Sequence, residues 1–517
     1  MLDHSTFDPV EMQISVERES STPIYRQIET QIRSLILKGR LPQGSYLPSE
    51  RMLAHHLAVN RTTVVNAYRE LAADGLVEGR VGEGTVVLGT ESGQAEEEAP
   101  STVPLSWTRL IRPEVRELRG SLVRRVEDLS MRPGVISLAT GVPRTIPSPH
   151  LHLKDLFQQV LATSGQSLFR DSPAAGLAPL RAELGRRLAM RGCVKPSAER
   201  IFILSGSQQG LYLVAHLLLH PGDVVLVESP TYLGALEVFR AVGARLVEVP
   251  LDDEGMRMEA MARILSHIDV HLIYTIPNFQ NPTGSTMSAG RRKALLTLAQ
   301  RHQVPILEDD LYGELAYDGA PPAPLRAIDE EECVLYLSGL SSILGPGLRL
   351  GWLLVPSALV KPLTALRQAM DLHPDNFVQE IVHTLLTEGG FDAHLEWVRS
   401  TYARRREIML GALGRYMPPG VRWNHPQGGF YIWCSLPQSL NSEELLDKAV
   451  DKGMIFVPGG VFFSDGRGEC FMRLSFVSPS AGDIEEGVRR LAAAVKELGE
   501  STKKARSSLF GAGRPVV

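Results

Sequence analysis

The alternation of apolar and polar positions divides the chain into two regions of different periodicity. Residues 18–88 show helical spacing that ends in short, glycine-punctuated strands. Between about residues 136 and 498, short apolar runs alternate with amphipathic helices. Five of these runs are typical of strands in a mostly parallel sheet: IFILSG, VVLVES, ARLVEVP, VHLIYTIP and VPILEDD. The pattern therefore predicts a small helical domain followed by a larger α/β domain.

The segment between the two regions has the composition of a linker. The stretch GTESGQAEEEAPSTVP is rich in Gly, Ser, Glu and Pro and poor in large apolar residues. We therefore predict a first domain over residues 18–88, a linker over 89–130, and a second domain over 131–500. The basic, glycine-containing segment 501–517 is expected to form a flexible tail.

Composition and charge limit the possible functions. The chain has 517 residues, of which 44% are hydrophobic and 22% charged, as in globular proteins with more than one domain. Its net charge of −5 means that any contact with DNA must be local. Four widely spaced cysteines show no metal-type pattern, and neither a signal-peptide pattern nor a bilayer-length apolar run occurs. These features predict a cytoplasmic protein without a metal site or a membrane partner; the cysteines are Cys193, Cys333, Cys434 and Cys470.

Two closely spaced helices are predicted in the first domain. Ser49 can cap a helix that starts at Glu50, and Asn60 can cap the next one. The first turn of the second helix then carries Arg61, Thr62 and Thr63, the kinds of side chain that contact base edges and phosphates in the major groove. A helical protein-interaction module is the alternative interpretation, because charged residues on helices are usually solvated.

A glycine-rich hairpin follows the two helices and carries Arg80. The order of cap, turn, polar first turn and hairpin resembles the winged helix-turn-helix of the GntR family. The resemblance implies contact with a double-stranded DNA operator, and Glu83 departs from the small polar residues usual in the wing. The residues implied to contact DNA are Arg51, Arg61, Thr62, Thr63, Arg80 and Gly82.

In the second domain, three motifs follow predicted strands. LSGSQQGL places the N–H groups of Ser207 and Gln208 at a helix start, where they can bind a phosphate. Tyr232 follows VVLVESP and could stack on a flat ring, although a lone tyrosine at such a position is more often part of the core. IPNFQNPTG contains two X-Pro bonds and a glycine, which force an irregular loop that directs Asn281 into a cleft.

Acidic residues end the strand VPILEDD. Asp309 could keep a pyridine nitrogen protonated, and Tyr312, three residues later, could hydrogen-bond a ring hydroxyl. Taken alone, the acidic residues favour a solvated loop. HPQGGFYIW and FMRLSF complete the set of motifs.

Together these motifs resemble the fold-type-I aminotransferases that use pyridoxal 5′-phosphate (PLP). Joined to a winged helix, such a domain is the architecture of the MocR subgroup of GntR-type regulators, and the resemblance covers nearly the whole chain. It implies an α/β large domain, a small C-terminal α+β subdomain and a homodimer. In the family, Arg473 would bind a substrate carboxylate. The implied cofactor-binding residues are Ser207, Gln208, Tyr232, Asn281, Asp309, Tyr312, Ser341, Ser342 and Arg349.

This chain departs from the family pattern at the residue that attaches the cofactor covalently. Seven residues before Arg349, the family has the lysine that attaches the cofactor, and this chain has Ser342. Gly339 stands where a phosphate-binding Ser or Thr is usual, and no lysine occurs between Lys293 and Lys361. Without that amine there is neither a covalent link nor the base for proton transfer, so no residue is predicted to be catalytic.

Three functions remain open on the sequence. The favoured one is a transcription regulator whose inactive aminotransferase-like domain senses a PLP-related or amino-acid-like effector, or serves dimerisation. PLP would then be bound non-covalently, or not at all. The alternatives are a PLP-dependent aminotransferase with a non-standard site and a purely structural dimer scaffold.

Overall fold

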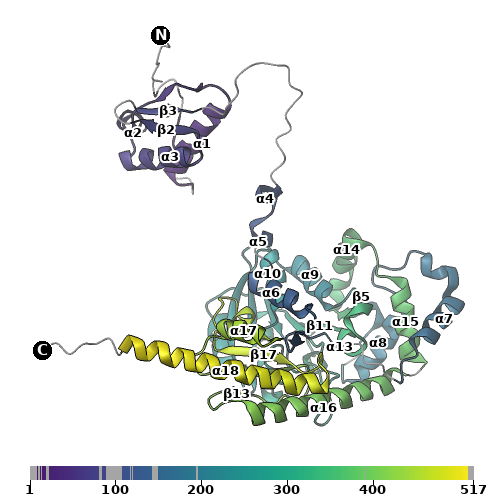
Figure 1. The fold of residues 1–517 in the computed structure, drawn as a ribbon. Coiled ribbons are helices and arrows are strands. Elements are labelled where there is room, and N and C mark those ends of the chain that lie inside the picture. Colours follow the sequence, from purple (N-terminus) through teal and green to yellow (C-terminus); the bar gives the residue numbers. More distant parts are fainter. Residues whose placement is uncertain are drawn as a thin grey trace. The chain divides into compact units, whose positions relative to one another are not determined.

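The computed structural model describes residues 9, 12, 14–18, 22–80, 84–88, 107–116, 118, 120–142, 149–193, 196–388 and 390–510. The chain divides into two compact units, Met1–Ser106 and Trp107–Val517 (Figure 1). No helix in the described part of the chain is long and apolar enough to cross a bilayer.

The first unit consists of three helices and a three-stranded antiparallel sheet of order β1-β3-β2. Its elements are α1 (Ile24–Leu37), β1 (Tyr46–Leu47), α2 (Glu50–His56), α3 (Arg61–Ala73), β2 (Val77–Arg80) and β3 (Gly84–Val87). Apolar side chains from all three helices form one core that includes Ile28, Leu53 and Leu71. The predicted helix pair and the strands of the hairpin are confirmed.

Polar caps set the starting points of α2 and α3. Ser49 Oγ accepts a hydrogen bond from the N–H of Met52 at 3.3 Å, and Asn60 Oδ1 accepts one from the N–H of Thr62 at 3.1 Å. These bonds satisfy N–H groups that the start of a helix leaves unpaired. As a result, α3 begins at Arg61 and its polar first turn is accessible.

The second unit is built on an eight-stranded sheet of order β5-β12-β11-β10-β9-β6-β7-β8. Its strands are β5 (Ile201–Leu204), β6 (Val224–Ser229), β7 (Arg245–Asp252), β8 (Gly255–Met256), β9 (Leu272–Thr275), β10 (Ile306–Asp309), β11 (Val334–Gly339) and β12 (Gly351–Leu354). The pairs from β7 through β11 are parallel, whereas β12 is antiparallel to both of its neighbours. The five predicted strands are therefore confirmed as β5, β6, β7, β9 and β10.

Helices cover both faces of this sheet. The helices between the strands and after them are α7 (Leu153–Ser164), α8 (Ala178–Met190), α9 (Ser207–Leu218), α10 (Leu233–Ala241), α11 (Met258–Leu265), α12 (Ala289–His302), α13 (Ser341–Leu344), α14 (Val360–Asp371) and α15 (Asn376–Thr387). Of these, α7 packs against α15. Val225 packs with α9 and α10, whereas the next residue, Leu226, packs with α11 and α12. Successive strand residues point to opposite faces, so continuous apolar runs are expected in strands buried on both sides.

A smaller α+β subdomain completes the second unit. Its four-stranded sheet has the order β13 (Arg422–Trp423), β14 (Tyr431–Ser435), β17 (Phe471–Ser475) and β16 (Val457–Pro458). The accompanying helices are α16 (Phe391–Tyr416), α17 (Ser442–Asp451) and α18 (Ala481–Phe510), and α16 and α18 lie side by side (Figure 1). Strand β4 (Ile136–Ser137) pairs in parallel with β15 (Met454–Ile455), and this pairing connects the segment after α6 to the subdomain.

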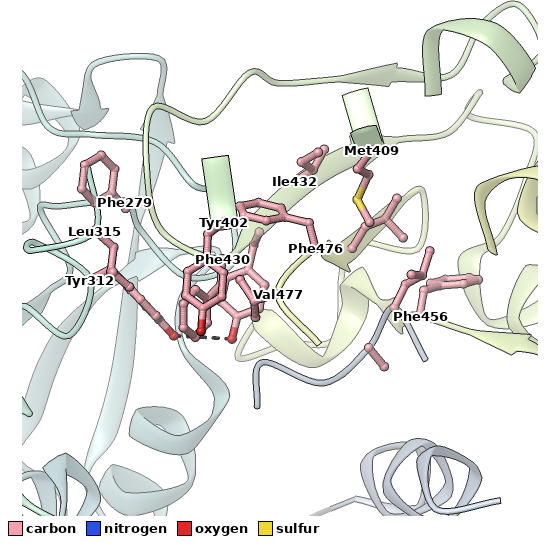
Figure 2. Packing of buried hydrophobic residues seen from close by; sticks show 14 of the residues in the cluster. Phe279, Tyr312, Leu315, Tyr402, Met409, Phe430, Ile432, Phe456, Phe476 and Val477 are labelled. Carbon is pink, nitrogen blue, oxygen red and sulfur yellow. Dashed lines mark hydrogen bonds between the residues drawn. The ribbon is translucent and has the colours of Figure 1, made fainter. Parts of the chain in front are cut away.

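An aromatic core connects the sheet to the subdomain (Figure 2). Phe430 packs against Tyr312, with ring centroids 5.0 Å apart, and against Tyr402 of α16, at 5.6 Å. All three rings are buried. Tyr312 is therefore held in place by packing as well as by its position after β10.

The structure changes two predicted boundaries. Residues 107–130 were expected to belong to the linker, but they form α4 (Trp107–Leu110), α5 (Pro113–Arg116) and α6 (Ser121–Ser130), all within the second unit. Val126 and Leu129 of α6 are buried, so burial of an amphipathic face explains this difference. Helix α18 also continues to Phe510, past the tail boundary predicted at residue 501.

Candidate functional site

Asp309 ends β10 with a carboxylate that is only partly satisfied. Its Oδ2 accepts a hydrogen bond from the Tyr274 hydroxyl at 2.9 Å, but its buried Oδ1 has no partner among the described residues. Burial raises the pKa of Asp309 to about 7. Ligands of α/β sheets usually bind at the carboxyl ends of the strands. An unpaired acceptor at that place therefore indicates a missing donor.

A second feature lies at the start of α9. Gly206 adopts φ +92°, and a Cβ atom at this position would lie 2.7 Å from Nη2 of Arg349. That guanidinium also donates to the carbonyl oxygen of Ser205 at 2.9 Å. The N–H groups of Ser207 and Gln208 open α9, whose first turn has no acidic residue. A helix start beside a guanidinium is a typical binding site for a phosphate.

Tyr232 lies between these two features. Its hydroxyl donates to Oε1 of Gln208 at 3.2 Å, and the amide of Gln208 donates to the carbonyl oxygen of Gly234 at 2.9 Å. Burial and, secondly, the nearby Asp309 carboxylate raise the pKa of Tyr232. The tyrosine ring is therefore neutral, fixed in position and close to the acid.

Arg473, on β17, forms the best-defined anion-binding group. It is 9% exposed, and its Nη1 and Nη2 donate to Asn281 Oδ1 at 2.8 Å and to the carbonyl oxygen of Ala139 at 3.0 Å. Its buried Nε has no partner in the described part of the chain. The guanidinium carbon also lies 4.0 Å from the centroid of the Tyr431 ring. Such a fixed guanidinium with a spare N–H suits recognition of a carboxylate.

Three of these groups, Tyr232, Arg349 and Arg473, border a cavity of about 450 Å³, whereas Asp309 and Ser207 are not among its lining residues. Of the predicted cofactor residues, Gln208, Tyr232 and Arg349 line it, together with Arg473. Asn281 is linked to the cavity through its hydrogen bond to Arg473. The described lining contains no lysine and is formed by Val123, Val126, Glu127, Ser130, Ala139, Thr140, Gly141, Val142, Gln208, Tyr232, Leu233, Gly234, Glu237, Arg349, Val457, Val461, Phe462 and Arg473.

Sequence reasoning did not identify the wall of this cavity that α6 provides. The spacing of Leu122, Val126 and Leu129 in SLVRRVEDLS marks an amphipathic helix and could have revealed it. Tyr431 was also overlooked, although its motif GGFYIW was recognised. The Tyr312 hydroxyl donates to that of Tyr431 at 3.4 Å, so Tyr312 has a partner within the protein.

Ser342 is buried in α13 and turned toward the protein interior. It is 2% exposed, and its hydroxyl donates to the carbonyl oxygen of Leu311 at 2.8 Å. Neither Ser341 nor Ser342 is among the residues that line the cavity. At Gly339, a Cβ atom would lie 3.2 Å from the carbonyl oxygen of Leu350, so the backbone there is closely packed.

In the first unit, several predicted DNA contacts meet in one groove of about 390 Å³. Arg51, Arg61 and Arg80 all line it, and Thr62 is exposed next to it along α3, with Thr63 partly buried. Nη2 of Arg61 pairs with Oε2 of Glu50 at 2.8 Å. Gly82, predicted to be in the wing, lies outside the described residues.

Comparisons with known proteins agree with this two-part structure. The family model of bacterial regulatory proteins of the gntR family matches residues 24–87, and that of aminotransferase class I and II matches residues 133–491. The HTH-type transcriptional regulator YisV of Bacillus subtilis is 35% identical over 93% of this chain and 98% of its own length. The probable rhizopine catabolism regulatory protein MocR of Rhizobium meliloti is 26% identical over 94% and 96%. The crystal structure of Pyrococcus horikoshii kynurenine aminotransferase has a TM-score of 0.72 and 36% identity, over 76% of this chain and 98% of the other.

Proposed function

This chain belongs to the MocR subgroup of GntR-type transcriptional regulators, in which a winged helix-turn-helix precedes a domain of the aminotransferase class I and II family, and from that premise we propose its function. The aminotransferase-like domain is a non-catalytic sensor. It binds a PLP-related compound or its amino-acid adduct without a covalent bond, and this binding changes the affinity of the winged helix for its operator.

One observation carries this proposal: the cavity keeps anion-binding groups, while the described residues that line it include no lysine. Arg349, Arg473 and Gln208 of the first turn of α9 line it, and α9 itself begins at Ser207. By contrast, Ser342 occupies the position of the family's lysine, and its hydroxyl is engaged with Leu311. A serine hydroxyl can neither form the covalent link nor accept a proton at neutral pH.

The residues present fit a phosphorylated pyridine. The unpaired Oδ1 of Asp309 would accept a hydrogen bond from a ring N–H, and the backbone N–H groups of Ser207 and Gln208, with Arg349, would hold a phosphate. When bound, PLP supplies an electron sink for chemistry at the α-carbon of an amino acid. Further positions that we assign to this site are Tyr232 at the ring face, Asn281 and Tyr312 at the hydroxyl edge, and Ser341 beside the phosphate. Ser342 keeps the position of the family's lysine, with its hydroxyl bonded to Leu311.

Proton transfer is the step that this chain's own residues do not support. Tyr312 is buried, Tyr232 is partly buried, and both are hydrogen-bonded. Desolvation raises the pKa of each. Neither phenol is therefore a base near neutral pH. The retained groups can bind and orient a ligand, whereas turnover would need an additional amine.

We further propose that the protein binds DNA as a homodimer. The first turn of α3, with Arg61, Thr62 and Thr63, would enter the major groove, while Arg51 and Arg80 would contact the adjacent backbone. Gly82 is assigned to the wing by its position in the sequence. A dimer would read two half-sites of the operator.

Spectroscopy and calorimetry with the full chain test the sensor. We expect pyridoxamine 5′-phosphate and PLP to bind reversibly, without a visible band that borohydride can fix, and to change the affinity for promoter DNA. Flat titrations with both compounds would favour a structural scaffold. A borohydride-fixed adduct in the unmodified protein would instead support the aminotransferase alternative.

A further inference from the structure

The cavity has a strongly apolar side that the phosphate and carboxylate groups leave unused. Its apolar lining comes from four places in the chain: α6, the segment after β4, the start of α10 and the segment around β16 and η6 (Gly459–Phe462). The residues are Val123, Val126, Val142, Leu233, Val457, Val461 and Phe462. A ligand that offered only a phosphorylated ring and a carboxylate would leave this surface without a partner.

Helix α6 contributes two valines to this side. Val123 and Val126 are three residues apart and therefore share one face of the helix. Leu129, which is 3% exposed, anchors the helix in the core. Arg125, on a different face, pairs with Asp447 of α17. The two valines thus belong to a wall that is anchored to the subdomain carrying Arg473.

Two carboxylates oppose an acidic ligand side chain. Glu127 of α6 and Glu237 of α10 line the same cavity, at exposed and half-buried positions respectively. Both add negative charge to this side of the cavity, which disfavours an additional carboxylate on the ligand, although solvent screens the exposed Glu127. Arg473 and Arg349 are the only basic residues in the described lining, and the proposed function assigns them to the α-carboxylate and the phosphate.

We propose that α6 forms an apolar specificity wall and that the effector carries an aliphatic or aromatic side chain on its amino-acid part. The side chain of such an adduct would pack against Val123, Val126 and Phe462 while its α-carboxylate binds Arg473. This inference rests on the proposed function, and it adds the chemical class of the effector.

Preformed adducts test the wall without requiring a covalent link to the protein. We suggest titrating the full chain with N-(5′-phosphopyridoxyl) derivatives of L-leucine, L-alanine, L-aspartate and L-lysine, with pyridoxamine 5′-phosphate as the probe that lacks a side chain. The leucine adduct should bind on the order of tenfold tighter than the alanine adduct, as expected when an apolar pocket gains methylene groups. The aspartate adduct should bind most weakly.

Variants then locate the contact. Val123→Ala should weaken binding of the leucine adduct several-fold but leave pyridoxamine 5′-phosphate unchanged. Val461→Ala, which alters a different element of the same wall, should do the same and guards against loss of α6 structure. Val115→Ala is the matched control, because Val115 is 43% exposed on α5 and does not line the cavity.

The possible outcomes separate this inference from the proposed function. Equal affinity for the leucine and alanine adducts, or tighter binding of the lysine or aspartate adduct, would overturn the apolar wall but keep the sensor. The apolar wall would also be overturned if both Val123→Ala and Val461→Ala still bound the leucine adduct more tightly than the alanine adduct by the same factor as the wild type. If neither pyridoxamine 5′-phosphate nor any adduct binds, the proposed function itself is refuted, and the wall with it.

Discussion

The hydroxyl of Ser342 donates a hydrogen bond to the carbonyl oxygen of Leu311, 2.8 Å away. Leu311 lies two residues after Asp309, the last residue of β10, so this bond connects the position of the missing lysine to the strand that carries Asp309. The serine thus has a structural partner of its own. Its hydroxyl is held by the protein and does not line the cavity.

Restoring the amine at this position tests whether the cleft is otherwise intact. The Ser342→Lys variant, mixed with PLP, should become yellow and keep the cofactor after borohydride treatment, because Asp309 and Arg349 remain to orient it. Mass spectrometry after proteolysis should place the adduct at position 342. The Ser400→Lys variant on α16 controls for a nonspecific amine; a colourless Ser342→Lys variant would contradict a retained cofactor cleft.

Asp309 should give the ligand-free protein a pH-dependent stability. Its pKa in the folded protein is raised from 3.8 to about 7, so the folded state holds this proton more tightly than the unfolded state does. The resulting stability is fully present below about pH 3.8 and is lost as the pH rises through about 7. Asp309→Asn should therefore be more stable than the wild type at pH 8, by roughly 1–4 kcal/mol, and the gain should shrink at pH 5.

Denaturant unfolding at the two pH values measures this difference. Asp128→Asn, at an exposed position on α6, is the matched control and should show no such dependence. Pyridoxamine 5′-phosphate should bind Asp309→Asn more weakly, because an amide accepts a hydrogen bond from a pyridinium less well than a carboxylate does. A stability difference that is the same at both pH values would refute the role assigned to Asp309.

On the DNA-binding unit, Arg61 should contribute to sequence recognition. Arg61→Ala should lower the affinity for the cognate promoter by about 1–3 kcal/mol if the guanidinium reads a base edge. Arg69→Ala, two turns later on α3 and exposed, is the control and should bind nearly as well as the wild type. Fluorescence anisotropy at fixed, moderate salt measures both, and equal affinities for wild type and Arg61→Ala would rule out this contact.

The ion pair between Arg61 and Glu50 adds a second expectation. Because the two side chains are 2.8 Å apart, DNA must compete with Glu50 for the guanidinium. Glu50→Gln should therefore increase affinity for DNA of any sequence, most clearly at low salt where surface charges are least screened. Unchanged nonspecific affinity would show that the ion pair has no role in the free protein.

The segment between the two units should be the preferred site of limited proteolysis. Its composition, rich in Gly, Ser, Glu and Pro, predicts cleavage between Leu88 and Trp107 and two stable fragments. Mass spectrometry of an early digest identifies the cut. Cleavage only within α4 to α6 would indicate that these helices are less stable than their burial in the second unit suggests.

Local sequence signals predicted much of the fold. Ser49 and Asn60 correctly predicted the starts of α2 and α3, because a helix cap depends only on residues close in the sequence. Continuous apolar runs likewise predicted the central strands, which are buried on both faces. The predicted linker is too long because only the stretch GTESGQAEEEAPSTVP has linker composition, whereas residues 107–130 form helices. The apolar spacing within α6 was present in the sequence but was not used.

Contacts between distant residues could not be predicted in the same way. Arg473 and Asn281 are 192 positions apart, and only the folded sheet and subdomain bring them together. The hydrogen bonds of Ser342 with Leu311 and of Tyr312 with Tyr431 also depend on tertiary packing. Motifs therefore identified the residue types of the site, while the cavity wall and the internal partners required the structure.

Gly206 offers the sharpest test of the phosphate site. Its φ of +92° disfavours any side chain, and a Cβ atom would lie 2.7 Å from Nη2 of Arg349, so Gly206→Ala must push the guanidinium away. Gly222 has nearly the same φ, +94°, with no atom within 4 Å of the added carbon, which makes Gly222→Ala the matched control. Both variants should lose about 1–3 kcal/mol of stability through backbone strain. Only Gly206→Ala should also bind pyridoxamine 5′-phosphate more weakly, by roughly tenfold or more, because a charge-assisted hydrogen bond to the phosphate is lost. Equal ligand affinity in the two variants, measured by calorimetry, would show that the phosphate does not bind between Arg349 and the start of α9.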